Sequence, residues 1–234
     1  APESTQLLAS GKNDSRTEFG GRSVPLDPAD RRRRVQLMAG RIEVELQITS
    51  EAGTGGKLWD ATPILAEWAL QHRDIWRGRI VHELGAGLGL PGLAIAVGAE
   101  PSRVILSDCV QECLAAMQQN VALNGVEDRV TVQRFDWRDA IGQPGRVPES
   151  LRADFVICSD VVYSREVAGW LPQAALACLR PGGTLFALLP LSRMGCRECL
   201  RNFGEIMRPF DPPGVDPSTD HAMADWIKHH LGSN

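Results

Sequence analysis

Short apolar runs and longer amphipathic stretches alternate over most of the chain. The short runs predict strands, because a strand covered on both faces reads as a nearly continuous apolar run, and the longer stretches predict helices. This alternation is typical of a Rossmann-like, doubly wound α/β fold with a mostly parallel sheet. The predicted strands cover residues 79–83, 103–107, 130–135, 154–159 and 183–189, and the predicted helices cover 62–71, 90–97, 110–123 and 166–179.

The N-terminal part departs from this alternation. Residues 1–30 are polar and have no apolar period that would supply a buried face, so we expect a mobile arm. Apolar and polar residues then alternate from Ile42 to Ile48, which predicts a strand of an N-terminal β-hairpin over about residues 31–50. For the first helix we expect Thr62 as the N-cap and Pro63 at the first helical position.

The C-terminal part lacks a clear closing pair of strands. The prolines of residues 209–217 exclude regular structure, and residues 220–231 predict one short amphipathic helix. In a Rossmann-like fold the C-terminal hairpin is therefore expected to be divergent or incomplete.

Composition narrows the class of protein. With 234 residues, 43% of them hydrophobic, the chain is long enough for one substantial core, and we expect a single domain over residues 31–234. The net charge of −4 disfavours nucleic acid as a partner. No apolar run reaches membrane-spanning length, which predicts no membrane partner, and nothing in the sequence indicates an oligomer, so a monomer is favoured.

Six cysteines without a secretory signal favour reduced thiols and a cytoplasmic location. The run from Arg31 to Arg34 leaves nuclear import as an alternative, beside its interpretation as the solvated start of the hairpin. Cys196 and Cys199 have the spacing of metal ligands, but no second pair accompanies them, so no metal is predicted.

The segment Val81-His-Glu-Leu-Gly-Ala-Gly-Leu-Gly89 carries the most specific chemistry in the sequence. It lies between a predicted strand and a predicted helix, where glycines let the backbone approach a ligand closely. The spacing of Gly85, Gly87 and Gly89 does not satisfy the dinucleotide fingerprint, and Pro91 removes a helix amide that a pyrophosphate would use. Both features favour a nucleoside without phosphate, such as S-adenosylmethionine.

Two acidic residues follow the next two predicted strands. Asp108 is placed to accept hydrogen bonds from ribose hydroxyls, and Asp136 is placed to accept one from an adenine amine, with the apolar face of Trp137 beside it. Alternatively, Asp108 caps a helix and Trp137 is an ordinary core residue. The combination of glycine loop and two acids predicts S-adenosylmethionine as the cofactor.

Together, four motifs resemble methyltransferase family 16, a group of seven-strand enzymes dominated by protein-lysine methyltransferases. The resemblance spans about residues 55–195, and it rests on Glu83-Leu-Gly-Ala-Gly-Leu-Gly-Leu-Pro-Gly92, Leu58-Trp-Asp-Ala61, Asp136-Trp137 and Ser159-Asp-Val-Val-Tyr163. It implies a seven-strand sheet, a protein substrate with a lysine acceptor, and Asp160 and Tyr163 as the catalytic residues. The residues expected to bind the cofactor are Trp59, Glu83, Gly85, Ala86, Gly87, Asp108, Asp136, Trp137 and Ser159.

Methyl transfer to an amine requires that its lone pair be held in line with the methyl group and the departing sulfur. Asp160 is suited to orient the amine by accepting its hydrogen bonds, while Tyr163 and Trp59 supply aromatic walls for a cation. Alternatively, Asp160 caps the helix that starts near Ser164, Tyr163 is a packed ring, and Trp59 anchors the helix at Thr62 to the sheet.

Other functions remain as alternatives to lysine methylation. Adenine methyltransferases of DNA and RNA carry prolines in the corresponding loop, whereas this chain has Asp160-Val-Val-Tyr163, so that class is disfavoured. A small-molecule methyltransferase, or a catalytically impaired interaction protein that binds S-adenosylmethionine, is consistent with the same cofactor half. A nicotinamide-dependent oxidoreductase is disfavoured by the glycine spacing.

Overall fold

A parallel sheet of five strands forms the centre of the protein, in the order β5-β4-β3-β6-β7. The computed structural model describes residues 32–190, 192 and 194–207. The five strands are β3 (Ile80–Leu84), β4 (Arg103–Asp108), β5 (Val130–Arg134), β6 (Ala153–Ser159) and β7 (Leu179–Leu188).

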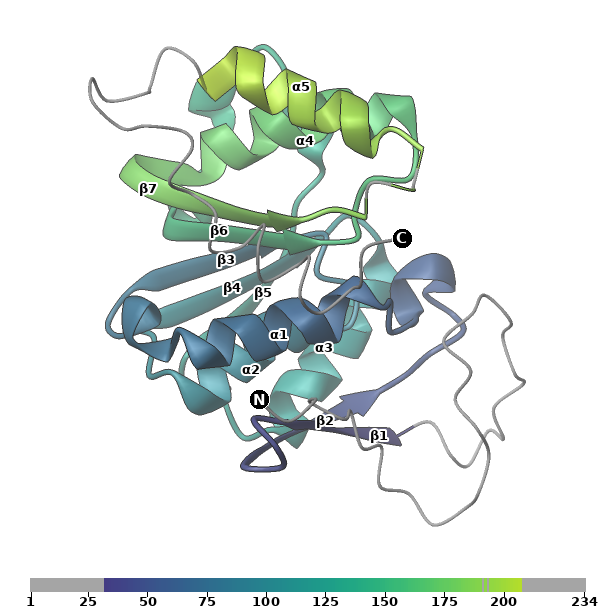
Figure 1. The fold of residues 1–234 in the computed structure, drawn as a ribbon, viewed down its shortest axis with the longest axis vertical. Helices are drawn as coiled ribbons and strands as arrows, with labels where there is room; N and C mark the ends of the chain where they lie inside the picture. The colour runs from purple at the N-terminus through teal and green to yellow at the C-terminus, as the bar shows by residue number, and fades with distance from the viewer. Residues whose placement is uncertain (1–31, 191, 193, 208–234) are drawn as a thin grey trace, which may run out of the picture.

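Helices cover both faces of this sheet (Figure 1). On one face lie α1 (Ala61–Gln71), α2 (Leu90–Gly98) and α3 (Gln111–Leu123), and on the other lie α4 (Arg165–Cys178) and α5 (Cys196–Met207). Each face has its own cluster of buried apolar side chains, because a parallel sheet joined by helical crossovers must bury both of its surfaces. The doubly wound α/β fold predicted from the alternation of runs is confirmed.

The strand order reverses at β3. The chain passes from β3 through β4 to β5 on one side, and then returns to place β6 and β7 on the other side of β3. Crossovers of opposite direction put the helices on opposite faces, and folds of this kind bind ligands at the carboxyl ends of the strands beside the reversal, here β3 and β6. The topology therefore positions the loops that follow β3, β4, β5 and β6 around one point.

The buried strands contain one titratable ring, that of His82 in β3. Its Nδ1 lies 2.7 Å from the carbonyl oxygen of Leu151 and its Nε2 lies 2.8 Å from the hydroxyl of Ser107. Burial lowers the pKa of His82 from 6.5 to about 4, so the ring is neutral at pH 7. The hydrogen bonds satisfy both nitrogens, which is what allows a polar side chain in the sheet interior.

A separate antiparallel hairpin consists of β1 (Arg32–Leu37) and β2 (Ile42–Gln47). Its inward side chains, Val35, Leu37, Val44 and Leu46, join the apolar cluster shared with α1, α2 and α3. At its turn, the backbone N–H of Met38 donates to the buried carboxylate of Glu67 on α1, over 2.8 Å. The hairpin is thus packed on the helical layer and does not extend the central sheet.

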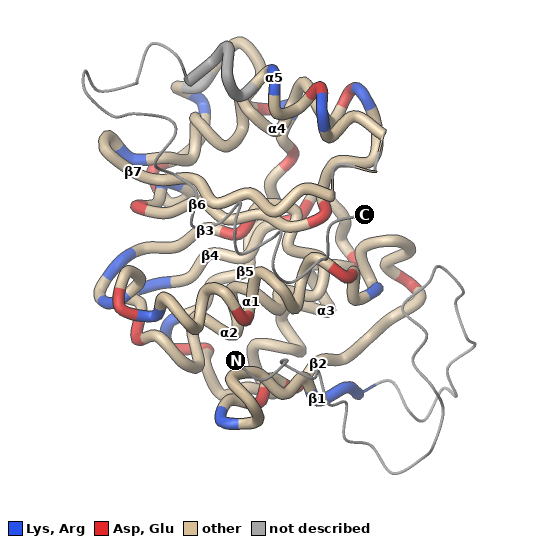
Figure 2. Tube along the Cα trace, viewed as in Figure 1, with Lys and Arg blue, Asp and Glu red and all other residues tan. Residues whose placement is uncertain are grey.

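Arginines of the basic run lie within β1. Arg34 donates to Glu45 across the hairpin over 2.9 Å, and Glu43 lies 3.6 Å from the same guanidinium. Acidic and basic positions are accordingly interspersed on the hairpin, as Figure 2 shows. Among the described arginines of this run, Arg34 is paired with acidic residues of the same hairpin.

One expectation is not confirmed, one requires correction, and one helix was not expected. The sheet has five strands among the described residues, so the seven-strand count is not confirmed. The first helix begins at Ala61 with Asp60 at the N-cap position, so Thr62 and Pro63 both lie inside its first turn, where a missing proline N–H costs nothing. The helix α5 was not expected from the sequence.

Two other expectations concern the ends of the chain. The mobile arm of residues 1–30, the proline-rich segment 209–217 and the helix 220–231 lie outside the described residues. Within the described residues, no helix is long and apolar enough to cross a membrane.

A matched pair of glycines tests the packing of α2 on the sheet. A Cβ added to Gly92 of α2 would lie 2.8 Å from a carboxylate oxygen of Glu83 and 3.1 Å from Val104, whereas one added to Gly169 of α4 would meet nothing within 4 Å. We expect Gly92→Ala to destabilise the protein by about 1–3 kcal/mol through overpacking. Gly169→Ala is expected to stabilise it by roughly 0.5–1 kcal/mol through helix propensity.

Urea unfolding followed by far-ultraviolet circular dichroism measures both changes. Equal effects of the two substitutions would contradict the close approach of α2 to β3 and β4.

Candidate active site

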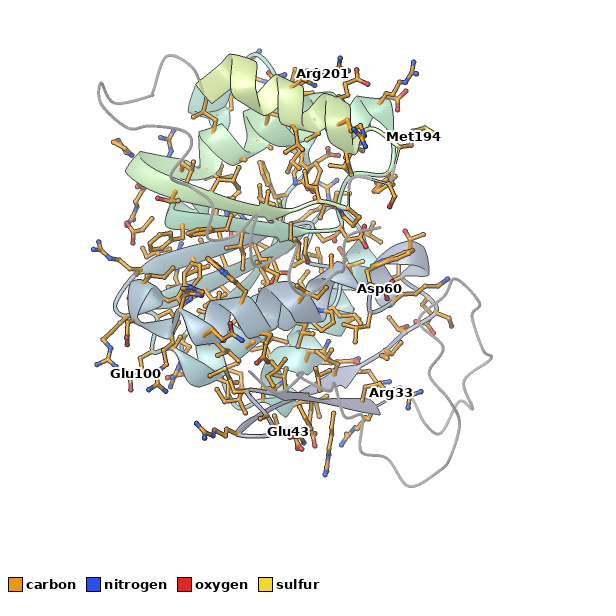
Figure 3. All side chains as sticks on the ribbon, viewed as in Figure 1. Arg33, Glu43, Asp60, Glu100, Met194 and Arg201 are labelled. Atoms are coloured by element: carbon orange, nitrogen blue, oxygen red, sulfur yellow. The ribbon has the colours of Figure 1, made fainter. Side chains whose placement is uncertain are left out.

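Four loops meet at the carboxyl ends of the strands, where the strand order reverses. They follow β3, β4, β5 and β6, and they contain every residue predicted to act in the site except Trp59, Glu83 and the strand-terminal residues Asp108 and Ser159. Figure 3 shows Asp60 and Met194 on the side of the molecule where the strand arrows end, and Glu100 on the opposite side. The candidate site lies on the side of Asp60 and Met194.

The loop after β3 consists of backbone held in an unusual conformation. Gly85, Gly87 and Gly89 have φ angles of 62°, 56° and 80°, in the left-handed region that other residues rarely adopt. The N–H of Ala86 donates to the carbonyl of Ser107 in β4 over 2.9 Å, and the N–H of Gly89 donates to the carbonyl of Ala86 over 2.7 Å. The loop therefore presents backbone rather than side chains at the switch point, the place beside β3 where the strand order reverses.

Neighbouring residues approach this loop so closely that side chains on its glycines would collide with them. A Cβ on Gly85 would lie 2.9 Å from Val161 and 3.1 Å from the ring of Trp137. The indole of Trp137 thus lies beside the glycine loop while also packing against the apolar cluster under α4. Both interpretations of Trp137, as a wall beside the loop and as a packed residue, are consistent with this position.

A second glycine segment, which the sequence analysis did not identify, packs against the first. The short 3-10 helix Gly53–Gly56 places the carbonyl oxygen of Gly55 2.7 Å from where a Cβ on Gly87 would stand. The indole N–H of Trp59 donates to the carbonyl of Thr54 over 2.9 Å, which ties Trp59 to this segment. The Gly-Thr-Gly-Gly sequence was the available signal, because closely spaced glycines outside a helix indicate close backbone contact.

Asp108 is part of the site and also of a local turn. One carboxylate oxygen accepts from the N–H of Gly87 over 3.1 Å, and the other accepts from the N–H of Val110 over 3.0 Å. Burial raises the pKa of Asp108, an effect that the hydrogen bonds from Val110 and Gly87 oppose. Since each carboxylate oxygen has a second lone pair, Asp108 can still accept hydrogen bonds from a bound diol.

Glu83 lies beneath the glycine loop. Its side chain is buried, and a carboxylate oxygen accepts from the N–H of Gly92 at the start of α2, over 2.8 Å. Burial raises the pKa of Glu83 from 4.5 to about 8, opposed by that hydrogen bond and helped by the nearby charge of Asp108. In the structure Glu83 holds the helix N-terminus, which makes it a support of the predicted cofactor site.

Asp136 forms an ion pair with Arg138, a residue that was not among the predicted site residues. Its carboxylate accepts from the backbone N–H of Arg138 over 3.0 Å and pairs with the Arg138 guanidinium over 2.6 Å. The side-chain hydrogen bond from Arg138 lowers the pKa of Asp136, so it is ionised at neutral pH. The guanidinium carbon of Arg138 also lies 5.8 Å from the ring of Trp170, which places the pair between the loop and α4.

The loop after β6 begins with Asp160, which is 9% exposed and has a φ of 55°. This left-handed conformation costs an aspartate less than most residues, and the backbone N–H of Asp160 donates to the carbonyl of Leu188 in β7 over 3.0 Å. The adjacent Ser159 hydroxyl lies 3.4 Å from that of Thr62 on α1. The helix that follows is capped by Ser164, whose hydroxyl accepts from Val167 over 3.3 Å. Asp160 is therefore not its cap.

Tyr163 faces solvent at the rim of this loop. Its side chain is 69% exposed, so it is not a packed core ring, and Met194 is 70% exposed on the neighbouring segment. A Cβ on Gly195 would lie 2.6 Å from the carbonyl of Ser164, which shows how closely the two segments approach. Partial burial and the proximity of Cys109 and Asp108 raise the pKa of Tyr163.

The predicted residues therefore divide into two groups. The loop residues Gly85, Ala86, Gly87 and Trp137 and the strand-terminal Asp108 are brought together at the switch point by the contacts above. Asp160 and Tyr163 lie on the loop after β6, on either side of Val161, which contacts Gly85. Among the residues that the structure describes, no three His, Cys, Asp or Glu side chains are grouped to hold a metal ion.

Comparison with known proteins identifies the family. A family model described as lysine methyltransferase matches residues 41–189. The chain belongs to this family. Its cofactor is S-adenosylmethionine, and the glycine-lined backbone at the switch point, with the Asp108 carboxylate beside it, fits a nucleoside ligand of this kind.

Curated relatives carry matching names. The chain is 38% identical over 130 residues to the human protein-lysine N-methyltransferase EEF2KMT, covering 51% of this chain and 38% of that protein. It is 31% identical over 135 residues to the protein N-terminal and lysine N-methyltransferase EFM7 of Cryptococcus neoformans, covering 56% of this chain and 45% of that protein. The chain thus spans less than half the length of these relatives.

Solved structures share the fold. The P. horikoshii TYW2 structure in complex with MeSAdo matches with a TM-score of 0.51 at 20% identity, over 77% of this chain and 61% of that chain. The T. thermophilus 16S rRNA methyltransferase RsmC, in complex with AdoMet and guanosine, matches with a TM-score of 0.52 at 21% identity, over 67% of this chain and 41% of that chain. At this identity the likeness shows the fold alone.

The buried carboxyl of Glu83 predicts a pH dependence of stability. With a pKa of about 8 in the folded protein and 4.5 unfolded, the folded state binds more protons between these values. The stabilisation is therefore complete below pH 4.5 and is lost as pH rises through 8. We expect Glu83→Gln, which has no such titration, to gain stability relative to wild type as pH rises from about 6.5 to about 8.

Urea unfolding of the two proteins across that range measures the difference. His82 contributes with the opposite sign, but it is present in both proteins, so its contribution cancels in the difference. Parallel stability curves would contradict a raised pKa of Glu83.

Asp108 is expected to contribute directly to cofactor affinity. We predict that Asp108→Ala weakens binding of S-adenosylhomocysteine by about 1.5–3 kcal/mol, the usual value of hydrogen bonds to a charged group. Glu112→Ala, in the exposed first turn of α3, removes the same charge and serves as the matched control. Isothermal titration calorimetry gives both affinities, and equal affinities of the two variants would remove Asp108 from the site.

Proposed function

We propose that this protein transfers the methyl group of S-adenosylmethionine to the side chain of a lysine in a protein substrate. The observation that carries the proposal is the arrangement of the loop after β6. Asp160 is 9% exposed at its base, while Tyr163 is 69% exposed at its rim. A long, flexible side chain that is attached to a macromolecule can pass such an exposed ring and still bring its amine to a buried carboxylate.

Asp160 and Tyr163 would contact different parts of the acceptor lysine. When bound, S-adenosylmethionine supplies an electrophilic methyl group on a positively charged sulfur. Asp160 would accept hydrogen bonds from the lysine amine and fix the direction of its lone pair, which is a large part of what an in-line displacement requires. A carboxylate is a poor final acceptor for the proton of an amine whose ordinary pKa is about 10.4, so orientation is the role proposed for Asp160.

Tyr163 would act on the aliphatic and cationic parts of the lysine. An aromatic face attracts an ammonium ion and packs against the methylene stem, so it guides the side chain before the amine loses its proton. Because the ring is open to solvent, its neighbourhood accommodates a polypeptide and does not enclose a small molecule. The names of the relatives, which include lysine and N-terminal amine acceptors, support an amine on a protein as the substrate class.

The decisive experiment measures transfer and cofactor binding separately. Wild type, Asp160→Asn and Asp139→Asn are incubated with a cell lysate and S-adenosylmethionine carrying a labelled methyl group. Asp139 is exposed on the loop after β5 and lies outside the proposed acceptor group, so it controls for the loss of one carboxylate. Mass spectrometry then identifies the labelled residue.

We expect wild type and Asp139→Asn to label lysine, and Asp160→Asn to lose at least about 100-fold in rate, the scale of a misoriented reactant. The affinity of Asp160→Asn for S-adenosylhomocysteine should stay within about threefold of wild type, below about 1 kcal/mol. Label on a small molecule or on an N-terminal amine would refute the lysine assignment. Cofactor binding without any transfer would indicate a catalytically impaired binding protein.

A further inference from the structure

Asn120 of α3 is fully buried, and both ends of its side-chain amide are hydrogen-bonded. The Nδ2 group donates to the carbonyl of Leu88 over 3.0 Å, and the Oδ1 atom accepts from the backbone N–H of Gln47 over 2.6 Å. Leu88 lies in the glycine loop between Gly87 and Gly89, whereas Gln47 ends the second strand of the N-terminal hairpin. One side chain therefore joins the hairpin to the loop that binds the cofactor.

Asn124, about one helical turn further along the chain, makes a parallel set of contacts. Its Oδ1 accepts from the N–H of Glu45 over 3.0 Å, and its Nδ2 donates to the carbonyl of Glu45 over 2.7 Å. The same Nδ2 donates to the carbonyl of Asn120 over 2.7 Å. The two asparagines are thus linked to each other and to alternate residues of β2.

The spacing of Asn120 and Asn124 along α3 lets them bond to alternate residues along one edge of β2. β2 pairs with β1 along one edge, and alternate residues such as Glu45 and Gln47 direct their N–H groups to the other edge. Buried backbone groups without a partner are costly, so an edge that packs against a helix needs donors and acceptors from that helix. The amides of Asn120 and Asn124 take the place that a further strand would occupy.

The chain after β2 makes a second connection to the same loop. It leads from Gln47 into the segment Gly53–Gly56, where the carbonyl of Gly55 packs against Gly87. The loop is therefore contacted on one side by the segment that follows the hairpin and on the other by Asn120. A change in the backbone of the loop around Leu88 would be transmitted to β2 through both.

We propose that Asn120 is a positioning residue that couples the N-terminal hairpin to the cofactor site, so that cofactor binding and hairpin order stabilise each other. The Leu88 carbonyl is held by the Asn120 amide, which restricts the backbone between two glycines that have great conformational freedom of their own. By linkage, a ligand that stabilises this loop conformation must also stabilise the contacts made through Asn120. The inference rests on cofactor binding and is independent of the acceptor.

The coupling is measurable in wild type without any substitution. The N–H groups of Gln47 and Glu45 are the donors in the two asparagine contacts, so their hydrogen exchange reports on those contacts directly. We expect saturating S-adenosylhomocysteine to slow exchange at Gln47 and Glu45 at least about 10-fold more than at the amides of β7, which report general stabilisation by a ligand. Equal slowing in β2 and β7 would overturn the proposal.

A matched pair of variants on α3 tests the role of Asn120. Asn120→Asp keeps an acceptor for Gln47 but sets an oxygen against the Leu88 carbonyl, whereas Gln119→Glu makes the same amide-to-carboxylate change at an exposed position. We expect Asn120→Asp to bind S-adenosylhomocysteine about 10-fold more weakly and to lose the extra slowing at Gln47. Gln119→Glu should behave as wild type in both measurements.

Far-ultraviolet circular dichroism establishes that each variant is folded. A folded Asn120→Asp variant with wild-type affinity would overturn the positioning role, as would an equal loss of affinity in Gln119→Glu. If Asn120→Asp does not fold, the exchange experiment on wild type decides the proposal by itself. Absence of lysine methylation in the lysate experiment would leave both readouts unaffected, so the two proposals fail separately.

Discussion

The structure depends on the close approach of backbone to backbone at the loop after β3. Gly85 faces Val161 and Trp137, and Gly87 faces Gly55, at separations that leave no room for a side chain. All three glycines of the loop adopt left-handed φ angles. Replacing any of them would displace a neighbouring loop or incur backbone strain, so the geometry of the whole switch point is set by these residues.

Buried polar side chains fix the loop that glycine makes possible. Glycine provides conformational freedom, and this freedom must be removed if a ligand is to meet a preformed site. Glu83 holds the N–H of Gly92, Asp108 holds the N–H of Gly87, and Asn120 holds the carbonyl of Leu88. Each contact satisfies a backbone group in the interior and restrains the loop from a different strand or helix. Side chains of the neighbouring elements β3, β4 and α3 therefore hold the loop in one conformation.

The proposed cofactor-binding residues and the proposed acceptor-binding residues differ in exposure. The glycine loop and Asp108 are enclosed by the segment Gly53–Gly56 and Trp137, whereas Tyr163 and Met194 project into solvent. Such a division suits an enzyme that binds one small cofactor and presents its transferable group to acceptors of large size.

The sequence by itself determined the alternation of strands and helices, the glycine spacing and the acidic residues at the strand ends, because each of these is a local pattern of a few residues. It did not predict α5 (Cys196–Met207). Cys196 and Cys199 of this helix are both buried, in the apolar cluster that includes side chains of α4. Whether such cysteines are buried depends on where their helix docks, which a local sequence pattern does not encode.

Only the tertiary structure decided the contacts between segments far apart in the chain. The pairing of Gly55 with Gly87, the bonds from Asn120 to Gln47 and Leu88, and the capping by Ser164 that leaves Asp160 at the base of its loop all follow from how the elements pack. Local propensity carries no information on such contacts. They form because buried backbone groups must find partners wherever the packed layers bring them together.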